Sequence, residues 1–319
     1  MKEEKIFEII ADIEEKYIAE AKIKSKKKKK QVWIKGIAAA ACLCLILVGV
    51  WNINKNFKSS NVENPAITDT ALYIPAVKLP DTTADMQQKM EPLVVYNGCI
   101  YTLTEDYYGS EALKIDNLIG EYLGYATGSI DEWSTQEEYS EEFASTMRGK
   151  VYEVIGYDTD FRICIRRDIN DDDGGEPEEQ LRITFFERLN DITLRTGADL
   201  FESRLHIRNQ IANIQWQSRD DLFYGKGNIQ NATLDSNLLE EFFDQVNKNM
   251  FIDLASPNKS IYDTPRRTHI YLTMKDGTII RLCLIEGGYV GYDGLAYCFV
   301  KIPEEIFNEV FTACGGTYE

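Results

Sequence analysis

The stretch LVVYNGCIYTL, residues 93–103, carries the strongest local signal for structure in this chain. Two apolar runs, residues 93–96 and 99–103, flank the dipeptide Asn97-Gly98. Because Asn and Gly tolerate positive φ, a two-residue turn of this kind joins two antiparallel strands. The stretch therefore predicts a β-hairpin, and we expect β-structure around it.

The pattern of apolar residues predicts further strands and a few helices. Before the hairpin, residues 72–79 are expected to pair as an edge strand. After it, strands are expected at residues 120–127, 150–157, 161–167, 181–187 and 213–217. Residues 135–147 read as a short helix or an acidic loop, and residues 200–207 as a helix.

The last hundred residues predict a smaller unit of helix, three-stranded meander and helix. Asp235 or Ser236 caps a helix over residues 237–249, and Pro303 opens the second helix. Between them, strands at 268–275 and 278–285 flank Asp276-Gly277, and 295–300 is the third strand. Glycines at 287, 288, 291 and 294 read as a flexible loop. Layers of this kind give an α+β fold class.

Composition excludes two classes of protein. The chain has 319 residues with 11% aromatic residues and 8 prolines, which argues against intrinsic disorder. Its formal net charge is −17, with 35 Lys+Arg against 52 Asp+Glu. Nucleic acid is therefore not expected as a partner, because phosphate binding needs a basic surface.

The charge changes sign across one apolar segment. Residues 1–35 carry 11 lysines and 7 acids, whereas residues 52–319 carry 24 basic and 45 acidic residues. Between these blocks, residues 32–53 are interrupted only by Lys35 and Asn52, and Trp33 and Trp51 bracket the apolar run. A stretch of about 20 apolar residues crosses a bilayer, and tryptophans favour its interfaces.

We expect this segment to be a retained single-pass transmembrane helix. The alternatives are a cleaved signal peptide, a lipoprotein signal and a buried core helix. A cleaved signal peptide would have small residues at its cleavage site, but Asn-Ile-Asn-Lys follows Trp51. A lipoprotein signal would need its cysteine after the apolar run, whereas Cys42 and Cys44 lie inside it. The lysines before the segment place its N-terminus in the cytoplasm by the positive-inside rule. The residues expected to contact the membrane are Trp33, Trp51, Lys26, Lys27, Lys28, Lys29 and Lys30.

Residues 3–20 predict a cytoplasmic amphipathic helix with acids on its polar side. Eighteen residues cannot cover their own apolar stripe, so we expect a protein partner or self-association, against the alternative of a frayed helix that only aids insertion. The expected partner-binding residues are Ile6, Ile9, Ile10, Ile13 and Tyr17.

These observations give five parts. They are a cytoplasmic helix and polybasic stretch (1–31), a transmembrane helix (32–53), a linker (54–92), an exported β-rich domain (93–218) and an exported α+β subdomain (219–319). The linker holds four of the eight prolines, which favour extended chain.

No pattern in the exported part predicts a catalytic, cofactor or metal site. The acidic stretch from Asp168 to Gly175 fails the spacing of an EF-hand and reads as a solvated loop. His206 and His269 are the only histidines, and no nucleophile turn accompanies them. Without CxxC, a zinc site has no sequence support. We therefore expect a protein that is not an enzyme and has no cofactor.

Five cysteines outside the apolar segment sit mostly in apolar runs, where cysteine behaves as a small hydrophobe. Their odd number argues against a disulfide scaffold. One pairing stays open: Cys283 and Cys298 are able to face each other if their strands form the last hairpin.

The N-terminal layout is similar to a known group. IFEIIADIEEKYIAEA, the lysine run and IAAAACLCLILVGV resemble the start of uncharacterised single-pass membrane proteins of Gram-positive gut anaerobes. GEYLGYATGSIDEW and FASTMRGKVYEVIGYDTDFRIC also resemble exported domains of this kind. Some of these proteins look like membrane-bound anti-sigma-factor regulators. This chain lacks their zinc-binding His-x3-Cys-x2-Cys pattern.

The sequence thus predicts a membrane-anchored extracytoplasmic binding or sensing protein. The resemblance implies an anti-sigma-factor-like regulator, with a sigma factor as the cytoplasmic partner of residues 3–20. The ligand outside the cell is not identified by any motif. The alternatives are an exported domain with a plain anchor and a cell-surface hydrolase.

Overall fold

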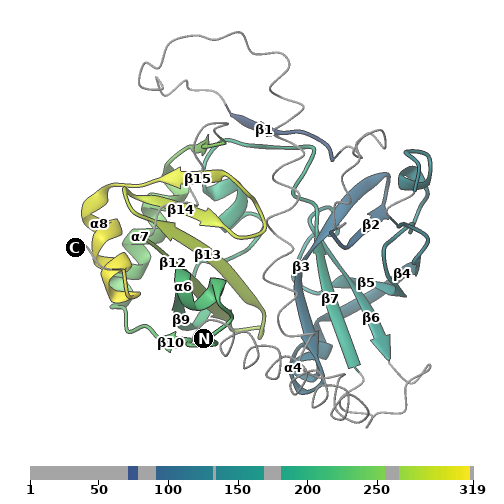
Figure 1. The fold of residues 1–319 in the computed structure, drawn as a ribbon, viewed down its shortest axis with the longest axis horizontal. Coiled ribbons are helices and arrows are strands. Elements are labelled where there is room, and N and C mark those ends of the chain that lie inside the picture. Colours follow the sequence, from purple (N-terminus) through teal and green to yellow (C-terminus); the bar gives the residue numbers. More distant parts are fainter. Residues whose placement is uncertain (1–70, 78–90, 132–133, 169–180, 256–265, 317–319) are drawn as a thin grey trace, which may run out of the picture. The chain divides into compact units, whose positions relative to one another are not determined.

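The computed structural model describes residues 71–77, 91–131, 134–168, 181–255 and 266–316. All of them fall in one of the two units into which the chain divides, residues 42–319. They form a β-rich α+β fold with few helices (Figure 1). The α+β class expected from the sequence is confirmed for this part of the chain.

The first large sheet has six antiparallel strands in the order β2-β3-β7-β6-β5-β4. Its strands are β2 (Leu93–Tyr96), β3 (Cys99–Tyr108), β4 (Ile119–Thr127), β5 (Arg148–Val154), β6 (Arg162–Asp168) and β7 (Leu181–Glu187). A helix α4 (Ser110–Ile115) and a 3-10 turn η1 (Asp116–Leu118) connect β3 to β4.

The predicted hairpin at Asn97-Gly98 is confirmed. Asn97 has φ 50° and Gly98 has φ 69°, and Tyr96 lies opposite Cys99 in the ladder. Both faces of the sheet are covered at its centre, because Ile163 and Cys164 belong to different buried clusters. This explains why the middle strands are apolar at consecutive positions rather than alternating.

The second large sheet has seven strands in the order β10-β9-β12-β13-β14-β15-β11. Its strands are β9 (Ile211–Ser218), β10 (Gln230–Asn231), β11 (Phe251–Asp253), β12 (Arg267–Met274), β13 (Ile279–Ile285), β14 (Tyr289–Tyr292) and β15 (Cys298–Lys301). A short helix α6 (Arg219–Phe223) follows β9. β9 precedes residue 219 and pairs with β12, so strands from both sides of the expected 218/219 division share this sheet.

The meander of this sheet contains one more strand than the sequence predicts. The hairpin at Asp276-Gly277 is present, with Gly277 at φ 93°. The glycine-rich stretch read as a flexible loop instead contains β14, which pairs with both β13 and β15. Gly291 is required within it, since a Cβ there would lie 2.6 Å from the ring of Phe299. Gly287 and Gly288 form the predicted turn, at φ 92° and 90°, whereas Gly291 marks close packing within β14.

Helices α7 (Ser236–Lys248) and α8 (Glu304–Ala313) cover one face of the seven-stranded sheet (Figure 1). The Asp235 carboxylate accepts hydrogen bonds from the backbone N–H groups of Asn237 and Leu238, which confirms the predicted cap. The helices bury residues spaced at helical periodicity, and these join the sheet in the largest core cluster: Phe242, Phe243, Val246, Phe307, Val310 and Phe311.

Smaller elements fill the remaining described chain. Residues 198–202 form a short π-type helix, η4 (Ala198–Glu202), and residues 135–147 contain only a 3-10 turn, η2 (Glu138–Ser140). The expected edge strand is present as β1 (Leu72–Ile74), which pairs with β8 (Ile192–Leu194). The acidic stretch after Asp168 lies outside the described residues.

Candidate functional site

The site residues expected from the N-terminal segment cannot be placed. Ile6, Ile9, Ile10, Ile13 and Tyr17 lie outside the described residues. The same holds for the expected membrane contacts: Trp33, Trp51, Lys26, Lys27, Lys28, Lys29 and Lys30. Within the described ranges, no helix has both the length and the apolar character needed to span a bilayer.

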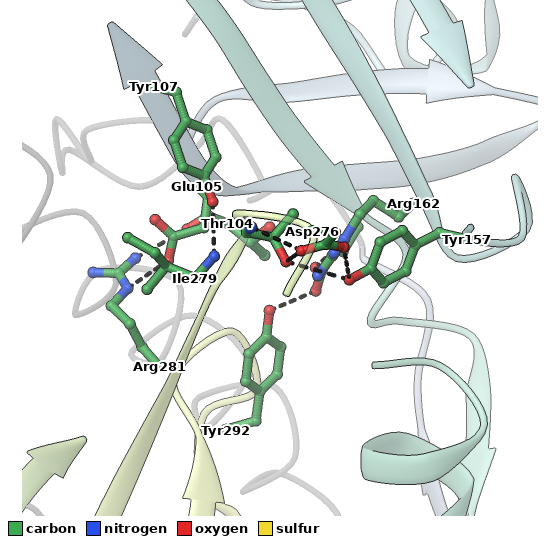
Figure 2. A network of polar contacts seen from close by, with 11 residues as sticks. Thr104, Glu105, Tyr107, Tyr157, Arg162, Asp276, Ile279, Arg281 and Tyr292 are labelled. Atoms are coloured by element: carbon green, nitrogen blue, oxygen red, sulfur yellow. Dashed lines mark hydrogen bonds and ion pairs between the residues drawn. The ribbon is translucent and has the colours of Figure 1, made fainter. Parts of the chain in front are cut away.

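The structure instead points to two clusters of buried polar groups. The first joins the six-stranded sheet to the seven-stranded sheet (Figure 2). At its centre, Arg162 Nε donates to Glu187 Oε1 over 2.9 Å, and Tyr292 donates its hydroxyl to Glu187 Oε2 over 2.8 Å. Arg162 and Glu187 are opposite one another on β6 and β7 and are almost wholly buried. Both carboxylate oxygens of Glu187 are thus engaged.

Three further contacts tie the β12–β13 hairpin to the first sheet. Arg281 on β13 donates to the Glu105 carboxylate over 2.7 Å and to the carbonyl oxygen of Thr104 over 2.9 Å. The hydroxyl of Tyr107 accepts a hydrogen bond from the backbone N–H of Ile279 over 3.0 Å (Figure 2).

The tip of the hairpin also contacts Tyr157, between β5 and β6. The Tyr157 hydroxyl donates to Asp276 over 3.2 Å, and the Arg162 guanidinium stacks on the Tyr157 ring at 4.0 Å. Burial raises the pKa of Glu105, against the lowering effect of Arg281, and burial raises the pKa of Tyr292, helped by the Glu187 charge. Such contacts specify how two elements pack, although Arg162 Nη1 has no hydrogen-bond partner among the described residues.

The second cluster lies on one face of the seven-stranded sheet. His269 on β12 is directly opposite Cys283 on β13, and Cys283 is opposite Gly291 on β14. Asp293 directly follows β14, and its backbone N–H donates to the carbonyl oxygen of Arg281 on β13 over 3.0 Å. His269 Nδ1 lies 3.3 Å from Asp293 Oδ2. One ligating atom from each of His269, Cys283 and Asp293 lies within 4.8 Å of the others.

The alternation of the strands decides which face the cluster occupies. Ile270, Leu282 and Leu284 belong to the core beneath α7 and α8. Their neighbours His269 and Cys283 therefore point to the opposite face. There, Cys283 belongs to a small separate apolar cluster with Ile285 and Phe299. A polar row continues beside it, since Tyr271 donates its hydroxyl to the side chain of Gln217 over 2.7 Å.

The electrostatics of this cluster suit ligand binding better than nucleophilic catalysis. Burial and the charge of Asp293 raise the pKa of the Cys283 thiol, and a protonated thiol is a poor nucleophile. Burial opposes ionisation of Asp293, but His269, Arg281 and Arg267 together lower its pKa. A carboxylate, an imidazole and a thiol in one place are the donors that zinc and related metals take from proteins.

A hollow of about 330 Å³ lies elsewhere, between the β5–β6 turn and η4. Its lining includes Asp158, Asp160 and Asp199, with Arg204 as the basic group. Asp199 is already engaged, because its carboxylate accepts the backbone N–H groups of Arg195 and Thr196. The acidic excess favours cationic over anionic occupants.

Sequence reasoning gave neither His269 nor Cys283 a role, because each reads singly as a buried core residue. Their pairing depends on a register that the structure shows: both lie seven positions from Asp276, whereas a two-residue turn at Asp276-Gly277 would place residue 269 opposite residue 284. The pairing considered between Cys283 and Cys298 is wrong, since both cysteines are free. β14 separates their strands, and the two side chains belong to different core clusters.

Comparisons with protein-family models, curated proteins and solved structures found no match to this chain. Its function is therefore argued from the residues alone.

Proposed function

We propose that this chain is a membrane-anchored extracytoplasmic binding or sensing protein. The observation that supports the proposal is the change of charge across residues 32–53. Seven lysines lie within residues 22–30, and the chain after the apolar segment carries 45 acids against 24 bases. Segments flanked by lysines orient with the lysine side in the cytoplasm. Residues 54–319 are then outside the cell.

The exported part supplies a binding module in this proposal. Two antiparallel sheets joined by buried polar contacts make a firm scaffold, because each contact demands a defined geometry. The acidic excess and the aspartates lining the hollow favour a cationic ligand, such as a basic peptide. The exported part binds in this proposal and does not catalyse a reaction.

Cysteine labelling in whole cells tests the topology. Ser25→Cys and Ser60→Cys are placed singly in a chain from which the native cysteines have been removed. An impermeant maleimide is expected to label position 60 in intact cells and position 25 only after permeabilisation. Labelling of position 25 alone in intact cells would overturn the proposed orientation.

We also propose a cytoplasmic protein partner for residues 3–20, with a sigma factor as the leading candidate. The apolar stripe supports this, since burying each of its large side chains contributes about 1.5–3 kcal/mol before ordering costs. A pull-down with residues 1–31 compares the wild-type segment with Ile9→Asp/Ile13→Asp. A partner that the double variant loses supports regulation. Binding that the double variant retains, or none at all, favours the plain anchor.

A surface hydrolase is the alternative for the exported part. A broad hydrolase screen on the purified protein separates the two readings, with His206→Ala and His269→Ala as variants. Turnover abolished by either variant would favour the enzyme.

A further inference from the structure

We propose that His269, Cys283 and Asp293 form a binding site for a divalent transition-metal ion of the zinc class. This proposal does not depend on the membrane anchor or on the ligand outside the cell. It differs from the sequence expectation of no metal site, which rested on the missing CxxC spacing. No such motif is needed here, because His269 and Cys283 are paired across β12 and β13, and Asp293 directly follows β14.

The first observation is the separation of the ligating atoms. Two ligands bonded to zinc at about 2.0–2.1 Å in a tetrahedral arrangement are about 3.3 Å apart. His269 Nδ1 and Asp293 Oδ2 lie at that distance, 3.3 Å. A thiolate at about 2.3 Å from the ion would lie slightly farther from each of them. The three ligating atoms lie within 4.8 Å of one another, which is near these separations.

The second observation is the burial of the imidazole. His269 is 7% exposed, and its Nδ1 atom faces Asp293. A metal bound at Nδ1 takes the place of the hydrogen bond to Asp293 and leaves the ring proton on Nε2, so the site uses the neutral imidazole.

The charges at the site are compatible with a dication. Asp293 contributes one negative charge, and metal binding by Cys283 displaces the thiol proton to solvent, which adds a second. The ion and its two anionic ligands are then neutral together, with His269 as the neutral ligand. Of the two guanidinium groups nearest Asp293, Arg281 is already paired with Glu105 at 2.7 Å, which reduces its repulsion of a bound cation.

The site is also reachable from solvent. Asp293 has 18% of its side chain exposed, against 9% for the His269 side chain and 3% for Cys283. Three protein ligands leave a coordination position for water, the arrangement of an open zinc site.

Cobalt substitution tests the proposal on the purified full-length protein after treatment with a chelator. Co²⁺ bound by a thiolate gives a charge-transfer band in the near ultraviolet, which carboxylate-bound Co²⁺ does not. We expect one equivalent of Co²⁺ to produce this band and Zn²⁺ to abolish it by displacement. Absence of the band from the wild-type protein would overturn the proposal.

Two matched pairs of variants locate the ion. Cys283→Ser is expected to lose the band, whereas Cys298→Ser, a buried cysteine that belongs to another cluster of the same sheet, keeps it. His269→Gln is expected to lower the affinity for Co²⁺ by at least about tenfold, whereas the exposed His206→Gln leaves it unchanged.

Thermal melting shows whether each variant is folded. Zn²⁺ is expected to raise the melting temperature of the wild-type, Cys298→Ser and His206→Gln proteins, and not that of His269→Gln. A band that survives Cys283→Ser, or wild-type affinity in a folded His269→Gln protein, would place the metal elsewhere and refute the site.

Discussion

Substitution of Glu187 by Gln tests whether the buried polar contacts of Glu187, with Arg162 in its own sheet and Tyr292 in the other, stabilise the described part of the chain. Glu187 and Arg162 are 0% and 1% exposed, so loss of the carboxylate charge leaves a guanidinium buried without a counter-ion. Removing one partner of a buried ion pair costs about 3–5 kcal/mol. The cation–π contact with the Tyr157 ring, 4.0 Å from the guanidinium, offsets only a part of this loss of stability.

The expected result is a large fall in thermal stability. A loss of about 3–5 kcal/mol lowers the melting temperature of a folded region of this size by about 6–20 °C. Circular dichroism of the purified full-length protein, followed during heating, measures the change. Tyr292→Phe removes only the hydrogen bond to Glu187 Oε2, so we expect a smaller loss of about 1–3 kcal/mol.

A double variant separates the ion pair from its surroundings. Arg162→Met/Glu187→Leu replaces both partners with apolar side chains, and such replacements are often neutral. We expect it to melt well above the single Glu187→Gln variant. If Glu187→Gln melts within about 2 °C of the wild type, the cost of an unpaired buried guanidinium does not apply here and the reasoning fails.

Three further predictions follow from local features of the described chain. Burial raises the pKa of Glu91 from 4.5 to about 7, so the native state holds its proton more tightly and stability falls as pH rises through that window. Glu91→Gln is therefore expected to stabilise the protein above about pH 7 by up to about 3 kcal/mol in urea unfolding, and to have no effect below about pH 4.5. A Cβ on Gly197 would lie 2.1 Å from a backbone oxygen of α7, so Gly197→Ala is expected to cost about 3 kcal/mol in the same assay. Gly98→Asn, at an open turn position, should cost about 1 kcal/mol or less. If Gly98→Asn and Gly197→Ala lower the free energy of unfolding equally, the steric argument is contradicted. Peptide mapping without reductant should find Cys283 and Cys298 unlinked after air oxidation, and a linked peptide would show that the strand order is wrong.

The sequence alone predicted the turns, caps and helix faces that short stretches of chain determine. The turn at Asn97-Gly98 needs two residues that accept positive φ, and that requirement is visible in the sequence itself. The cap at Asp235 and the apolar faces of α7 and α8 are equally local, since spacing along the chain fixes which side chains share a helix face.

Sequence reasoning failed where a residue's role depends on a distant partner. The glycines from 287 to 294 match a loop in composition, yet β14 forms there because Gly291 admits the ring of Phe299 from the next strand. By its type alone, Arg162 would be expected at the surface. In the structure, the pairing of β6 with β7 places it opposite Glu187, where both side chains are buried.

The sequence by itself determined the α+β class, the two hairpins, the cap of α7 and the charge change that underlies the proposed anchor. Each follows from φ preferences, side-chain periodicity or summed charge, all of which are properties of short stretches. Tertiary structure alone decided the order β10-β9-β12-β13-β14-β15-β11 and the meeting of His269, Cys283 and Asp293. Strand order and register depend on the free energy of burying whole faces, which no single stretch contains.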